Sequence, residues 1–172
     1  MSPVRRPPAP WRGPAWWGVV VLVWLAAFWR VPALPDAWTP DGLLLALLGW
    51  AFAQRALPSG SSAAGRGALV GGLKDLASSG PFGSWLVVYA AAAWLAARAA
   101  RTIAREEPVT QVVWVAVFAL GTIAAHAGWL VLRGEGALAP ALLGTFGLSG
   151  SLATGVASLL VFPLIKRVVA ES

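Results

Sequence analysis

Long apolar runs separated by short polar segments are the dominant pattern of this chain. They cover about residues 15–30, 42–56, 67–79, 84–105, 109–132 and 138–165. Apolar residues follow one another continuously within each run, which favours helices over the alternating strands of a membrane barrel. A helix needs about 20 apolar residues to cross the hydrocarbon layer of a bilayer. The pattern therefore predicts an all-α integral membrane protein built as a six-helix transmembrane bundle.

The lengths of several runs qualify this expectation. The second and third runs are shorter than a full span, so tilt, local thinning of the bilayer or burial among longer helices are the alternatives. The last run is long, and we expect its crossing part to be Leu148–Ile165. The first run also resembles a signal peptide, but the Trp residues inside it favour a retained helix. We expect a basic leader at residues 1–14 and one bundle at residues 15–167.

Basic residues gather on one side of the predicted bundle. Ten of them fall in inner segments when the N-terminus is cytoplasmic, and two fall in outer segments. Inner segments hold Arg5, Arg6, Arg12, Arg55, Arg66, Arg98, Arg101, Arg105, Lys166 and Arg167, and outer segments hold Arg30 and Arg133. This bias follows the positive-inside rule and predicts that both termini are cytoplasmic. The net charge of +6 is thus spread between apolar runs and does not indicate nucleic-acid binding.

Polar residues inside the apolar runs are the candidates for a functional role. Asp75 is costly in apolar surroundings, so we expect it to make an interior polar contact, structural rather than catalytic. Its neighbour Lys74 points elsewhere on a helix and is expected to extend outward to the headgroups. His126 lies among small residues and is expected to hydrogen-bond across a helix interface. We hypothesise that Asp75 and His126 face the same polar pocket.

Small residues spaced four apart predict close approach of helices, either within the bundle or with a partner helix. The pairs are Gly67 and Gly71, Gly121 and Ala125, Ala124 and Gly128, and Ser151 and Gly155. Gly80-Pro81-Phe82-Gly83 is predicted to form a turn between two of the helices.

The composition leaves little material for catalysis. The chain has no Cys and one His, and 12% of its residues are charged, about half the usual share. No phosphate-binding loop, metal-ligand cluster or nucleophile elbow occurs in it. We therefore expect no catalytic residue, no cofactor and no metal. An enzyme acting on lipids would need several acids, or His and Arg, at one membrane face, and it ranks last among the functions considered.

Four short motifs occur in order along the chain. They are Pro40-Asp41; Gly71-Gly72-Leu73-Lys74-Asp75-Leu76 followed by Ser78-Ser79-Gly80-Pro81-Phe82-Gly83; Arg105-Glu106-Glu107-Pro108 with Gln111; and Phe162-Pro163-Leu164 with Lys166-Arg167. Together they resemble MreD, the family of rod shape-determining membrane proteins, over about residues 15–167. The chain departs from the family in having Lys74 where an apolar residue usually precedes the Asp, in a longer loop at 58–62, and in its many Trp residues.

The resemblance implies a non-enzymatic scaffold of the bacterial cell-elongation machinery in the cytoplasmic (inner) membrane. The partners it implies are MreC and, directly or through it, MreB, RodA and the transpeptidase that works with RodA, besides membrane lipids. It also implies a fold similar to the substrate-binding subunits of energy-coupling vitamin transporters. Such a subunit is the alternative function, because Trp38, Trp85 and Trp129 with Asp75 and His126 are candidates to line an outward pocket.

Overall fold

The computed structural model describes residues 17–18, 20–21, 39–53, 60–78, 82–100 and 108–170, and the elements within them are helices. The expected all-α class is therefore confirmed. The helices are α2 (Gly42–Ala53), α3 (Gly60–Ala77), α4 (Ser84–Ala99), α5 (Pro108–Leu132), α6 (Ala139–Leu142) and α7 (Leu148–Ala170), with a 3₁₀ turn at Gly136–Leu138 and a π-helical turn at Leu143–Gly147. The leader and most of the first predicted run lie outside the described residues.

Helix α3 begins earlier than the sequence pattern predicted. Residues 60–62, expected in a loop, form its first turn, so the predicted start of the third run at residue 67 is wrong. The helix has 18 residues and is about 27 Å long, rather than a short segment. Its first half is held by packing, because Ala63 and Gly67 are buried and α3 lies along α4. Tertiary contact thus overrides the weak helix propensity of Gly and Ser.

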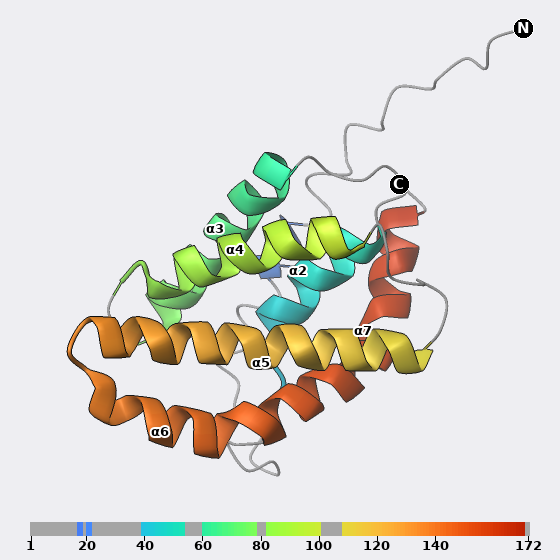
Figure 1. Cartoon of the computed structure of the whole chain (residues 1–172). Coiled ribbons are helices and arrows are strands. Elements are labelled where there is room, and N and C mark those ends of the chain that lie inside the picture. The colour runs from blue at the N-terminus through green and yellow to red at the C-terminus, as the bar shows by residue number, and fades with distance from the viewer. Residues whose placement is uncertain are drawn as a thin grey trace, which may run out of the picture.

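Within the described residues, two helical segments are long and apolar enough to cross a membrane. They are Val109–Leu132 and Gly136–Ile165, and the apolar helices at Gly42–Phe52 and Ser84–Ala99 are shorter. The last segment contains the π-helical turn, and α7 begins at Leu148, where the crossing part was expected to begin. Pro163 lies inside α7, where it cannot donate a ladder hydrogen bond, and the helix bends along its length (Figure 1).

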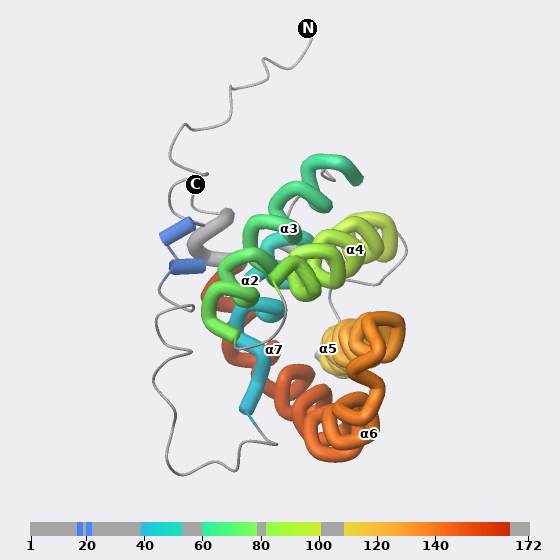
Figure 2. Tube along the Cα trace, turned by 90° about the vertical axis from the view of Figure 1, so that its left-hand side faces the viewer, coloured from blue at the N-terminus to red at the C-terminus, as the bar shows by residue number. Residues whose placement is uncertain are grey.

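Helix α2 is at the centre of the packing. All side chains from Leu43 through Phe52 are buried, and the helix contacts α3, α4, α5 and α7. Helices α3 and α4 lie side by side on one flank, while α5 runs beside α6 and the first part of α7 on the other (Figures 1 and 2). This arrangement brings the start of α2, the end of α3 and the middle of α4 together.

Candidate functional site

Asp75, near the end of α3, holds the start of α4. It is 4% exposed, and its carboxylate accepts hydrogen bonds from the backbone N–H groups of Gly83 (3.0 Å), Trp85 (3.1 Å) and Leu86 (3.0 Å). The hydroxyl of Ser84 donates a fourth at 3.3 Å. The first N–H groups of a helix have no intrahelical partner, so Asp75 supplies from α3 the cap that α4 needs. This cap on α4 is the interior structural contact of Asp75.

The predicted turn between α3 and α4 contributes to the same cap. Gly83 has a φ of 97°, a left-handed conformation that favours Gly, and it occupies the N-cap position of α4. Its own side chain offers no capping group, which is why an acceptor from another helix is required. Gly80 and Pro81 lie outside the described residues. Asp75 and Gly83 thus act together to start α4.

Asp41 starts α2 in a related way. Its side chain accepts the N–H of Leu44 at 3.1 Å, and its carbonyl accepts the N–H of Leu45 at 2.9 Å. Its own N–H donates to the hydroxyl of Thr154 on α7 at 3.0 Å. Asp41 therefore acts as an N-cap and also joins the start of α2 to the first third of α7.

Lys74 turns into the bundle and does not extend outward, so the predicted orientation of its side chain is wrong. Its ammonium group forms a salt bridge with Asp41 and donates to the hydroxyl of Tyr89 at 2.9 Å. Tyr89 in turn donates to Asp41. The two charged side chains are 24% and 23% exposed, and a cation in such a place needs a nearby anion. Asp41 is that anion, so pairing within the bundle replaces contact with the headgroups.

Trp85 and Tyr89 place aromatic rings beside the salt bridge, and His126 stacks on Trp85. The ammonium of Lys74 lies 3.9 Å from the ring centroid of Trp85, a cation–π contact. The indole meets Tyr89 edge to face at 5.8 Å and stacks on His126 at 4.0 Å with an interplanar angle of 13°. We call Asp41, Lys74, Tyr89, Trp85 and His126 the polar junction. It draws its side chains from α3, α4 and α5 and from the residue before α2.

His126 does not make the expected cross-helix hydrogen bond within the described part of the chain. It is 6% exposed, and its Nδ1 is buried with no hydrogen-bond partner there. The contact across the helix interface is the stack on Trp85 instead. Trp85 contacts both members of the proposed pocket, because its backbone N–H donates to Asp75 and its ring stacks on His126. That Asp75 and His126 share one polar pocket stays a prediction.

The small residues divide into two groups. A Cβ on Gly67 would meet Ala93 at 2.8 Å, one on Gly71 would meet the Cα of Leu86 at 2.7 Å, and one on Gly155 would meet the carbonyl of Val112 at 2.9 Å. These glycines, with the buried Ser151 that bonds to Gly147, pack helices within the chain. Gly121, Ala125 and Gly128 on α5 are exposed, and the two glycines have no neighbour within 4 Å of a built Cβ.

The carboxylates of Asp41 and Asp75 hold helix starts in place. No group of three or more metal-binding side chains occurs in the part of the chain that is described. Both oxygens of Asp75 are occupied by donors from α4, and Asp41 is occupied by Lys74, Tyr89 and Leu44. Sequence reasoning missed Tyr89, although it is the only Tyr in the chain and interrupts an apolar run.

Comparison of the chain with protein-family models, with curated proteins and with solved structures gives no match. Its function is therefore argued from the residues and their geometry.

Proposed function

We propose that this protein is a non-enzymatic membrane scaffold of the bacterial cell-elongation machinery, related to the MreD family. Two of the motifs that carry the resemblance, Pro40-Asp41 and Asp75 with Gly83, contain the groups that start α2 and α4. Because these groups fix where two helices begin, the motifs specify how the helices are connected. Proteins that share a fold are expected to share such connections. The resemblance therefore concerns residues with a structural role, and not only similar sequence motifs.

The observation on which the proposal depends is that polar side chains are buried inside the bundle while large apolar side chains are exposed on its surface. Asp75, Ser84, Thr154 and Ser158 are each at most 4% exposed. Large apolar side chains, in contrast, point outward along α7: Leu148 (70%), Leu152 (52%), Val156 (58%), Leu160 (76%) and Leu164 (61%). An apolar surface of this extent indicates a membrane or a protein partner. With the two long apolar helices and the positive-inside bias, it supports a multi-pass protein of the inner membrane with six crossings and cytoplasmic termini.

A scaffold role follows from what the surface offers. Asp41, Lys74 and Tyr89 satisfy one another inside the bundle, so the outer face presents mainly apolar groups for lipids and for transmembrane helices. The partners proposed are MreC and, directly or through it, MreB, RodA and the transpeptidase that works with RodA.

A small-molecule carrier, such as the substrate-binding subunit of an energy-coupling vitamin transporter, is the second candidate. It is favoured by two buried polar atoms without partners among the described residues, His126 Nδ1 and Trp129 Nε1. Both belong to α5, one turn apart, and the ring of His126 stacks on Trp85 of the polar junction. Buried donors and acceptors without partners are groups that a polar ligand or a water molecule would satisfy.

Affinity purification from native membranes in mild detergent separates the two functions. We expect the tagged protein to recover a bitopic MreC-like protein together with cell-wall synthases. Recovery of a pair of ATPases with a coupling subunit would instead establish the carrier, and stabilisation of the purified protein by a vitamin would agree with it. Protease or tag mapping of both termini tests the topology, and an external terminus would rule out the arrangement proposed here.

A further inference from the structure

Close contacts at glycines group the described helices into two units. A Cβ added to Gly67 or Gly71 of α3 would overlap a backbone carbonyl of α4, so these two helices meet backbone to backbone. A Cβ on Gly49 of α2 would overlap side chains of α7, and one on Gly155 of α7 would lie 2.9 Å from a backbone carbonyl of α5. One unit is therefore the pair α3 and α4, which we call the α3–α4 hairpin, and the other contains α2, α5 and α7 (Figures 1 and 2).

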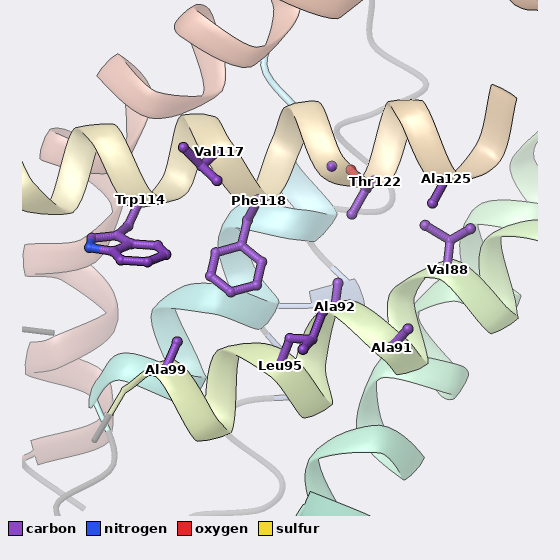
Figure 3. Close-up of a pocket in the computed structure, with 11 residues that line it drawn as sticks. Val88, Ala91, Ala92, Leu95, Ala99, Trp114, Val117, Phe118, Thr122 and Ala125 are labelled. Atoms are coloured by element: carbon purple, nitrogen blue, oxygen red, sulfur yellow. The ribbon is translucent and has the colours of Figure 1, made fainter. Parts of the chain in front are cut away.

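An open groove lies where the two units meet along α4 and α5. The two helices are antiparallel beside it, so Val88 faces Ala125 at one end, and Ala99 faces Trp114 at the other (Figure 3). Gly121 of α5 lines the groove, and a Cβ added to it would have no neighbour within 4 Å. Helices α4 and α5 thus do not interlock at this glycine as α3 and α4 do at theirs.

The polar junction joins the two units near the turn of the hairpin. Lys74, near the end of α3, forms its salt bridge with Asp41 at the start of α2, and Tyr89 of α4 donates to the same carboxylate. Trp85, in the first turn of α4, stacks on His126 of α5 at 4.0 Å. The hairpin therefore contributes three side chains that bind the other unit, and all three lie toward its turn end.

The opposite end of the hairpin is attached through the chain itself. Residues 54–59 connect α2 to the start of α3, and residues 100–107 connect the end of α4 to α5. Arg66, in the first half of α3, also lies over the ring of Trp50 on α2, 4.4 Å from its centroid. The covalent connections keep this end close to α2 and α5 even when noncovalent contacts are broken, whereas the turn end depends on the polar junction.

A bilayer makes this difference important. Lipid tails are as apolar as the helix faces, so there is no hydrophobic driving force between helices, and close packing and polar contacts decide which helices stay together. We propose that the α3–α4 hairpin moves as a rigid unit about its connected end, and that the polar junction holds its turn end against α2 and α5. Breaking the junction then moves the turn outward and widens the α4–α5 groove. This inference goes beyond the proposed scaffold role and rests on the membrane location.

Distances between pairs of spin labels, measured by double electron–electron resonance on the protein in lipid nanodiscs, test the motion. The chain has no Cys, so labels attach only at introduced positions. Phe82→Cys with Leu132→Cys places exposed labels on the turn of the hairpin and at the end of α5 that follows His126. A rotation of about 10° over the length of α3, about 27 Å, moves the turn by about 5 Å. We expect Lys74→Met to lengthen or broaden the label distance by about this amount.

Two controls locate the effect. Arg66→Met is the matched variant, because it replaces a cation of the same helix by Met at a contact that lies toward the connected end. It is expected to leave the distance between the labels unchanged. A second label pair, Leu69→Cys with Val87→Cys, lies within the hairpin at exposed positions of α3 and α4. Its distance is expected to stay the same in Lys74→Met, since the hairpin moves as one unit.

Several results would overturn the proposal. A Lys74→Met protein that is folded by circular dichroism and keeps the parent distance would do so, and Tyr89→Phe repeats the test if the first variant does not fold. An equal change in Arg66→Met would show that the turn end does not depend on the junction in particular. A changed distance within the hairpin would show that α3 and α4 do not move together. Extraction of the parent protein from membranes by alkaline carbonate would overturn the membrane location itself, which separates that failure from failure of the motion.

Discussion

Replacing Asp75 by Ala should destabilise the protein more than any other single change in the polar interior. The side chain is 4% exposed and accepts three backbone N–H groups at 3.0–3.1 Å, together with the hydroxyl of Ser84. Each buried donor left without an acceptor costs about 1–3 kcal/mol. Because Trp85 and Leu86 are only partly buried, water relieves some of this cost. We expect Asp75→Ala to lower the free energy of unfolding by about 3–5 kcal/mol.

Two further variants divide this loss into its parts. One carboxylate oxygen binds Trp85 N–H and Ser84, and the other binds Gly83 and Leu86 N–H. Asp75→Asn keeps one acceptor oxygen, so it should lose about half, or about 2 kcal/mol, including the charge–dipole attraction at the start of α4. Ser84→Ala removes only the hydroxyl and should cost about 1 kcal/mol.

The measurement is unfolding by sodium dodecyl sulfate in mixed micelles, followed by circular dichroism and Trp fluorescence. The order of stability expected is parent, Ser84→Ala, Asp75→Asn and Asp75→Ala. An Asp75→Ala protein within about 1 kcal/mol of the parent would show that α4 does not depend on this cap. A larger loss for Asp75→Asn than for Asp75→Ala would show that the amide NH2 group, facing the donors at the start of α4, is worse for stability than the absence of any acceptor.

Three further sets of variants test the packing and the polar junction by the same unfolding assay. Gly71→Ala should lower the free energy of unfolding by about 3 kcal/mol, because the new Cβ meets the backbone of α4. Gly65→Ala, with open space around it, should be neutral or stabilising by up to about 1 kcal/mol. Equal effects of the two substitutions would contradict the close approach of α3 to α4. Asp41→Asn and Lys74→Met should each lower the free energy of unfolding by about 2 kcal/mol, and the double variant should lower it by at least about 1 kcal/mol less than the sum of the two. Additive effects of the two substitutions would mean that the salt bridge contributes nothing to stability. His126→Phe keeps the stack on Trp85 and removes a nitrogen without a partner, so the free energy of unfolding should stay within about 1 kcal/mol of the parent value. A loss above about 2 kcal/mol would reveal a hydrogen-bond partner for Nδ1.

Helix class and several helix starts were predictable from the sequence because the signals are local. Continuous apolar runs gave the helices, and Pro40-Asp41 marked the beginning of α2, where a Pro and a capping acid are favoured. The start of α3 was not predictable in the same way. Residues 60–62 have the composition of a loop, and they are helical because the segment that follows is packed against α4.

The arrangement of the polar junction was beyond sequence reasoning for a different reason. Lys74 was expected to extend outward because its partner, Asp41, is 33 positions away and belongs to a different helix start. Nothing local predicts that pairing. Asp75 was recognised as an interior acid, but its ligands are residues 83–86, which reach it only once the turn has folded back. The type of residue was predictable, whereas its partners depended on tertiary structure.

The acids of the interior are bound to helix starts and to a neighbouring cation, which fits the scaffold proposed above. A helix that begins inside an apolar environment leaves N–H groups that water cannot satisfy, so the chain must provide acceptors itself. Asp41 and Asp75 provide them for α2 and α4, and Lys74 compensates the charge of Asp41. A general acid or base needs a carboxylate with a free position and room for a substrate beside it. Asp75 binds donors at the start of α4 with both oxygens, whereas Asp41 caps α2 with one oxygen and binds Lys74 and Tyr89 with the other. Both carboxylates are therefore occupied within the bundle, an arrangement that fits the proposed scaffold.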